Sequence, residues 1–277
     1  MKLRGGKFGL FAWMCVAWLV IVTLFAVLAP WIPFVDDPEN SDLSVFGDGP
    51  SWSHWFGVDE IGRDVFARVV WGARMSLVIG FSATLMAVII GGTLGLVAGF
   101  RGGRFDSFVA ATVDIALAVP TLILLLFVVA VFGRSLPVII FTLAWLMVPF
   151  SARVIRAATL SESHREYILA ARVSGAHDRR ILRREILPAV TPVILTFALI
   201  VVGIVILLEG TLAFIGLGLP PPTPTWGSMI SEGRTALDDA PHISLFPSAI
   251  MFLTLLAINI IGDAVQPRSG KRESGVI

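Results

Sequence analysis

Long apolar stretches alternate with polar and charged segments along this chain. A helix needs about 20 mainly apolar residues to cross the hydrocarbon of a bilayer. The pattern therefore predicts six transmembrane helices, at about Gly9–Ala29, Met75–Phe100, Phe108–Phe132, Leu136–Phe150, Pro192–Phe214 and Ile243–Ile261. Pro30 ends the first stretch, and Pro137 and Pro149 bound the short fourth one. The first stretch carries no charge from Phe8 to Val35, which is longer than the core of a cleavable signal peptide, so we expect a retained helix.

The composition supports a membrane protein and limits other classes. Apolar residues make up 56% of the 277 residues and charged residues only 15%, against about 25% charged in soluble domains. A net charge of +1 gives no electrostatic basis for binding nucleic acid. One cysteine, Cys15, excludes an intrachain disulfide, and the four dispersed histidines show no metal-binding spacing.

Lysine and arginine residues set the orientation, because basic residues near span ends resist translocation. With the N-terminus in the cytoplasm, the inner segments hold sixteen basic residues and the outer segments five. Eight of the sixteen lie between Ser151 and Ala189. This excess predicts an even number of spans with both termini in the cytoplasm.

The first outer segment, Ile32–Arg74, is acidic and rich in turn-forming residues, so most of it is expected to be loop. Its end differs, because apolar residues recur there on one helical face and Asp64 and Arg68 have the spacing of an i,i+4 ion pair. These features predict a helix at Arg63–Trp71 that lies on the outer membrane surface.

The second outer segment, Ile215–His242, begins with two glycines and a proline-rich run that exclude regular helix. Trp226 follows this run. Because an amphipathic indole ring is favoured at the membrane boundary, Trp226 is expected at the interface.

The longest inner segment, Ser151–Pro188, is expected to form two short helices. Ala170 and Ala171 favour the first helix, Gly175 can end it, and Asp178 can cap a second, arginine-rich helix parallel to the membrane. A rigid pair of helices joined to two spans can transmit a push into the membrane. A basic helix that only holds anionic headgroups explains the same residues.

This inner segment resembles the cytoplasmic EAA loop of binding-protein-dependent ABC importer permeases. That loop reads Glu-Ala-Ala, three residues, Gly, then about nine residues to Ile-Leu-Pro, and it is matched here by Ala170, Ala171, Gly175, Ile186, Leu187 and Pro188. Leu169 stands where the motif has glutamate, so an acidic contact is not carried over to that position. Glu166, one turn earlier, would replace it only in a rotated helix.

The resemblance implies that this loop docks on an ATPase. The implied coupling residues are Glu166, Tyr167, Leu169, Ala170, Ala171, Arg172, Gly175, Ala176, Ile186, Leu187 and Pro188, with the main contact at Tyr167–Ala176.

Other segments look like one branch of that family, the C-type permeases of dipeptide, oligopeptide and nickel systems. The stretch from His54 to Arg68 resembles the branch pattern His-x-x-Gly-Thr-Asp-x-x-Gly-Arg-Asp, with Val58 in place of threonine. Similar signatures follow the fifth span, at 209–218 and 222–229, and lie near the C-terminus, at 259–267. The resemblance covers about 8–268.

The resemblance implies an all-α type I ABC importer permease in the cytoplasmic membrane of a prokaryote. It implies a second, related but distinct permease, two ATP-binding subunits that use ATP and magnesium, and an extracytoplasmic solute-binding protein. Dipeptides or oligopeptides are the expected cargo, with nickel or another small solute as the alternative. We divide the chain into 1–32 (tail and first helix), 33–74 (external loop with the surface helix), 75–268 (five-helix core with the coupling loop 151–190) and 269–277 (cytoplasmic tail).

Three acids lie at or near membrane depth: Asp114, Glu209 and Asp263. Charge is costly there, so such residues either pack against polar partners or line a path. On the second span, Gly91, Gly95 and Gly99 share one face, which favours close helix packing within the chain or against a second permease.

Other function classes lack their signatures. No Gly-x-x-x-x-Gly-Lys-Ser/Thr stretch exists for ATP, and no nucleophile, base or metal-ligand set forms an enzyme site. An ion-coupled secondary transporter would place buried ionisable residues in related halves, which the three acids do not do.

Overall fold

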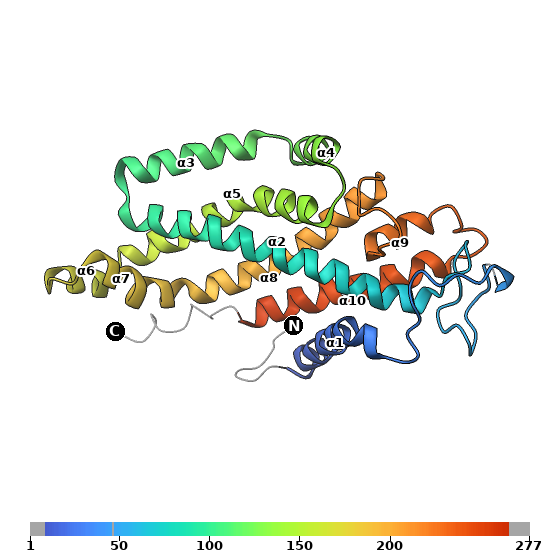
Figure 1. The fold of residues 1–277 in the computed structure, drawn as a ribbon. Coiled ribbons are helices and arrows are strands. Elements are labelled where there is room, and N and C mark those ends of the chain that lie inside the picture. Colours follow the sequence, from blue (N-terminus) through green and yellow to red (C-terminus); the bar gives the residue numbers. More distant parts are fainter. Residues whose placement is uncertain (1–8, 46, 266–277) are drawn as a thin grey trace.

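The computed structural model describes residues 9–45 and 47–265, and helices form nearly all of their regular structure. Figure 1 shows α2, α5, α8 and α10 running along the molecule, with α6 and α7 at one end and α9 toward the other. The α-helices are α1 (Leu10–Leu28), α2 (Val65–Arg101), α3 (Gly103–Ala118), α4 (Thr121–Phe132), α5 (Leu136–Ser163), α6 (Glu166–Val173), α7 (Asp178–Ile181), α8 (Leu187–Phe214), α9 (Trp226–Glu232) and α10 (His242–Val265). Short 3-10 turns occupy Ala29–Trp31 and Leu43–Val45, and a π-helical turn, Leu182–Ile186, joins α7 to α8.

Within the described residues, five helices are long and apolar enough to cross a membrane, and α3 with α4 makes a sixth, bent span. The expected third span, Phe108–Phe132, is therefore broken, with a 78° bend between its halves. The cause is Pro120, which disfavours helical backbone at the residue before it. Val119 is accordingly extended, with φ −76° and ψ 126°.

Two spans extend further at their inner ends than expected, because the prolines taken as their limits lie inside the helices. The fourth was expected to end at Phe150, but α5 continues to Ser163 with Pro149 inside it. The fifth was expected to begin at Pro192, but α8 begins at Leu187 and contains that proline. Membrane helices tolerate proline, because neighbouring helices and local π or 3-10 turns satisfy the freed backbone groups.

The separate surface helix expected at Arg63–Trp71 is not found, because these residues start α2. Asp64 caps that helix, and its side chain accepts a hydrogen bond from the backbone N–H of Ala67 at 2.7 Å. The expected Asp64–Arg68 pair is also wrong, since Asp64 bonds His54 instead. The 37 residues of α2 span about 55 Å at 1.5 Å per residue, so the helix extends well beyond the hydrocarbon.

Glycines bring α2 into backbone contact with α5. A Cβ atom on Gly91 would lie 2.3 Å from the Val148 carbonyl oxygen, and one on Gly95 would lie 2.4 Å from that of Ala152. A Cβ atom on Gly99 would likewise lie 2.6 Å from the Arg156 carbonyl oxygen. The stripe of glycines on α2 therefore packs within this chain, which was the first of the two readings of the sequence.

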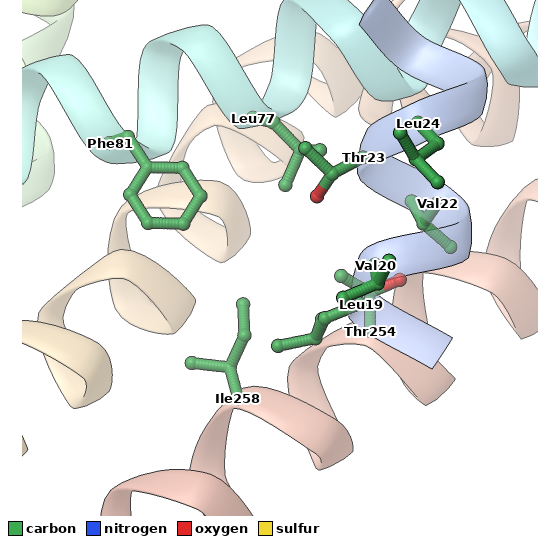
Figure 2. Close-up of a pocket in the computed structure, with 9 residues that line it drawn as sticks. All are labelled: Leu19, Val20, Val22, Thr23, Leu24, Leu77, Phe81, Thr254 and Ile258. Atoms are coloured by element: carbon green, nitrogen blue, oxygen red, sulfur yellow. The ribbon is translucent and has the colours of Figure 1, made fainter. Parts of the chain in front are cut away.

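The main core lies where α2, α4, α5 and α8 meet, and fully buried aliphatic side chains such as Ile79, Leu125, Leu143 and Val205 fill it. A second cluster joins α1 to α2, α8, α9 and α10. The indole N–H of Trp18 on α1 donates to the Thr254 hydroxyl of α10 at 3.2 Å. Beside this contact is a groove of about 280 Å³, shown in Figure 2, lined by Leu19, Val20, Val22, Thr23, Leu24, Leu77, Phe81, Thr254 and Ile258.

Candidate functional site

The inner loop between α5 and α8 forms a helix and a tight turn. Helix α6 ends in a Schellman motif, in which the Ala176 N–H donates to the Ala171 carbonyl and the Gly175 N–H to the Arg172 carbonyl. Gly175 has φ +77°, a conformation that side chains with a Cβ rarely adopt. The short helix and the role expected of Gly175 are both present in the structure.

Buried apolar side chains fix this element to the inner ends of two spans. Ile168 of α6, Ile181 of α7 and Ile186 of the π-helical turn are fully buried, and they pack around Phe100 at the end of α2. The Arg172 guanidinium lies 5.2 Å from the centre of the Phe100 ring. A force applied to α6 would therefore reach α2 and α8 through packed side chains.

The opposite side of α6 is open. Its exposed residues include Glu166, Tyr167, Leu169, Ala170, Arg172 and Val173. Val173 is 90% exposed, although it is apolar, and it stands next to the turn. A hollow of about 180 Å³ beside the turn is lined by Ala171, Ser174, Gly175, Ala176, Arg180, Ile181 and Glu185.

Tyr167 joins α6 to the end of α5. Its hydroxyl donates to the Glu162 carboxylate at 2.6 Å. Loss of solvent and this hydrogen bond to an anion raise the pKa of Tyr167 to about 12. The phenol therefore remains a donor at physiological pH and holds the first turn of α6 in place.

The second, basic helix is shorter than expected and is not separate from the fifth span. Asp178 is its first residue rather than its cap, which is His177. The helix passes through the π-helical turn into α8, so Asp178–Phe214 forms one continuous helical span of 37 residues. Of the other expected coupling residues, Ile186 is buried in this span, whereas Leu187 and Pro188 are exposed on it.

The three acids at membrane depth have different surroundings. Asp114 on α3 forms an ion pair with Arg153 on α5. Glu209 on α8 is 1% exposed, and it accepts a hydrogen bond from the Thr225 hydroxyl at 2.8 Å. Asp263 is exposed near the end of α10.

Helix α9 packs into the outer half of the molecule, where three spans hold its first turn. Trp226 was expected at the membrane interface but is fully buried. Its indole N–H donates to the Val69 carbonyl of α2, and its backbone N–H donates to the Ser76 hydroxyl, both at 3.1 Å. Thr225 and Ser228 form a capping box. The ring is buried because its polar atom finds a partner inside the fold.

Four charged residues meet at the outer end of α2, in a cluster that was not expected from the sequence. Arg68 is 2% exposed and donates to Asp59 at 2.6 Å and to Glu232 of α9 at 2.8 Å. Arg63 contacts the same two carboxylates, at 2.7 and 3.1 Å. A hollow of about 340 Å³ adjoins the cluster. The spacing of Asp59, Arg63 and Arg68 was visible in the sequence, but their partner Glu232 lies over 160 residues away.

Comparison with protein families gives a match over most of these elements. Residues 91–274 match the family described as the inner membrane component of binding-protein-dependent transport systems. The matched segment covers α3 to α10 and the last 11 residues of α2, and it includes α6 and the turn at Gly175.

Curated relatives align over almost the whole chain. The chain is 38% identical to the glutathione transport system permease protein of Pectobacterium atrosepticum over 250 residues, 89% of this chain and 83% of the relative. It is 37% identical to the dipeptide transport system permease protein of Alkalihalophilus pseudofirmus over 255 residues, 91% and 84% of the two chains.

A solved structure shares the fold at low sequence identity. An inward-facing conformation of the MetNI methionine ABC transporter aligns with a TM-score of 0.59 and 22% identity. The alignment covers 72% of this chain and 97% of the other.

Proposed function

Since the chain belongs to the family of inner membrane components of binding-protein-dependent transport systems, we propose that it imports short peptides as one permease subunit of an ATP-driven importer. The observation that supports short peptides as the cargo is the alignment, over about nine tenths of the chain, with permeases named for dipeptide and for glutathione. Both names describe small peptides with charged ends. Dipeptides and glutathione are therefore the cargo class to test first.

The exposed face of α6 and its turn is the proposed docking surface for an ATPase. Three features support it: the face is open, the turn is fixed by the Schellman motif, and buried side chains connect it to α2 and α8. ATP and magnesium are expected in the partner ATPases. A second permease and an external binding protein complete the proposed assembly.

The assembly is tested by purifying the tagged chain from its native membranes in mild detergent and identifying what comes with it. We expect an ATPase and a second permease. In proteoliposomes with the binding protein, the complex should take up radiolabelled dipeptide with ATP and not with a non-hydrolysable analogue. Recovery of the chain alone, transporting without ATP, would reject the importer and favour a secondary transporter.

The docking surface is tested by Gly175→Leu with Gly216→Leu as the matched control. Both glycines have positive φ, +77° and +81°, and both have open space where the side chain would start, so the backbone strain is similar. Only Gly175 lies on the proposed ATPase side. We expect Gly175→Leu to reach the membrane and to lower uptake per ATP hydrolysed at least about tenfold, because the rigid turn is lost from the docking surface. Equal uptake by the two variants would contradict docking at this turn.

A further inference from the structure

Two ion pairs join α3 to α5. Arg156 of α5 holds Asp106 in the first turn of α3 through two hydrogen bonds, the second at 2.6 Å. Arg153, one turn away on α5, holds Asp114. Figure 1 shows α3 lying alongside α5 over this length.

The second pair lies inside the membrane. Asp114 follows Asp106 by eight residues along one helix, which is about 12 Å at 1.5 Å per residue. The residues that surround Asp114 on α3, such as Val113 and Ile115, are apolar. Half of the hydrocarbon is about 15 Å thick, so Asp114 reaches well into it from the inner surface.

Exposure distinguishes the two pairs. The side chains of Asp106 and Arg156 are 15% and 29% exposed, whereas those of Asp114 and Arg153 are 65% and 55% exposed. The deeper pair is thus the more open one. Charged side chains at membrane depth face the interior of a bundle or a water-filled cavity, since contact with lipid is costly.

The helices around this pair leave a side of the chain uncovered. Helices α3 and α4 together form an arm, in which only Val109, Leu125 and Val129 are buried. The outer faces of this arm therefore lack packing partners within the chain. In the proposed pair of permeases, a path between the two subunits would run along an uncovered side of this kind, and open charged groups are expected there.

Building on the proposed function, we propose that Asp114 and Arg153 line the aqueous path for cargo in the inner half of the membrane. One carboxylate and one guanidinium give this part of the wall no net charge. The wall therefore repels neither the ammonium nor the carboxylate end of a peptide, and it offers each end a counter-charge.

The proposal is tested by cysteine accessibility in the purified, reconstituted transporter. Cys15 is the only cysteine of the chain, so Cys15→Ala gives a thiol-free subunit to which Asp114→Cys or Arg153→Cys is added. Ile115→Cys is the matched control, because Ile115 adjoins Asp114 and is an apolar side chain with 71% exposure. The probe is a charged, membrane-impermeant thiosulfonate supplied from the ATPase side.

We expect the thiols at 114 and 153 to react at least about tenfold faster than the thiol at 115. Slow reaction at all three positions would place the pair against lipid or the partner subunit and overturn the proposal. If loss of the ion pair prevents assembly, Ala111→Cys, one turn from Asp114 with both charges kept, answers the same question. ATP-dependent uptake by the Cys15→Ala parent tests the proposed function separately, so slow labelling of an active transporter counts only against the path assignment.

Discussion

Arg68 is the charged residue whose surroundings most constrain substitution. It is nearly fully buried, and its partners are the buried Asp59 and the half-exposed Glu232. Leaving one member of a buried pair without its partner costs about 3–5 kcal/mol. At this position the cost falls mainly on Asp59, because Glu232 still reaches solvent, but Asp59 keeps its 2.7 Å contact with Arg63, so the low end of that range applies.

We therefore expect Arg68→Met to lower the free energy of unfolding by about 3 kcal/mol, the low end for breaking a buried pair, measured by denaturation in detergent. Arg234→Met is the control, since Arg234 is exposed and lies 4.8 Å from the centre of the Phe214 ring. A contact of that kind contributes about 0.5–1 kcal/mol. Similar losses in the two variants would argue against a buried, energetically important pair.

The effect of Arg68→Met on stability should also depend on pH, because Arg68 contacts the titratable Asp59. Burial raises the pKa of Asp59 above 3.8, and the hydrogen bond from the Ile61 N–H and the nearby Arg68 oppose this only in part. The folded chain thus holds this proton at higher pH than the unfolded chain, so the contribution of Asp59 to stability is largest below pH 3.8 and is lost as the pH rises through the folded pKa. Removing Arg68 raises that pKa further. The loss caused by Arg68→Met should therefore be smaller at pH 5 than at pH 8, and a loss independent of pH would assign it to packing alone.

At the scale of elements, the crossing of α8 and α9 depends on one of two glycines. A Cβ on Gly227 would lie 2.4 Å from the Cα of Gly210, whereas a Cβ on Gly210 would meet nothing closer than 3.7 Å. The two residues face each other, but only Gly227 points its missing side chain at backbone.

We expect Gly227→Ala to separate α9 from α8 and to lower the free energy of unfolding by about 1–3 kcal/mol through overpacking. Gly210→Ala should change it by less than about 1 kcal/mol, since alanine also favours the helix that contains it. Denaturation of the two variants under the same conditions compares them directly. If Gly210→Ala proves the more harmful, the crossing geometry described here is wrong.

Hydropathy predicted the existence of these elements better than their ends. Six apolar stretches corresponded to five helices and one bent pair, because the apolar requirement of the bilayer acts on whole segments. Proline was the less reliable signal: Pro120 breaks a span, whereas Pro149 and Pro192 lie inside helices. The difference depends on which neighbours satisfy the backbone, and those neighbours are distant in sequence.

The candidate site was likewise predictable from the sequence only in part. The turn at Gly175 was predictable, since its helix formers and its glycine are adjacent in sequence. The pairing of Asp114 with Arg153, of Glu209 with Thr225 and of Arg68 with Glu232 was not, because these partners are distant in sequence. Trp226 was misplaced because an indole ring suits a membrane boundary and a core equally well when its N–H has a partner.

At the scale of the whole molecule, packing is uneven. Most described helices bury several side chains in a shared core, but α3 and α4 bury few. This arm should therefore open locally more readily than the rest of the chain.

In the isolated subunit in detergent, we expect backbone amides of 105–132 to exchange with deuterium faster than those of α2. In the assembled transporter their exchange should slow, because the arm gains a partner, while α2 changes little. Hydrogen–deuterium exchange followed by mass spectrometry measures both. Equal exchange of the arm before and after assembly would mean that assembly gives it no protein partner.

The uninterrupted run of helix from Asp178 to Phe214 has a mechanical consequence. Its 37 residues make a lever of about 55 Å, with the proposed ATPase-docking side at one end and the crossing with α9 near the other. Tilting such a lever by about 10° about its lower end moves its upper end by about 10 Å, which is twice the pitch of a helical turn. A small rotation imposed at the inner end would thereby become a large displacement at the outer end, with no loop in between to absorb it.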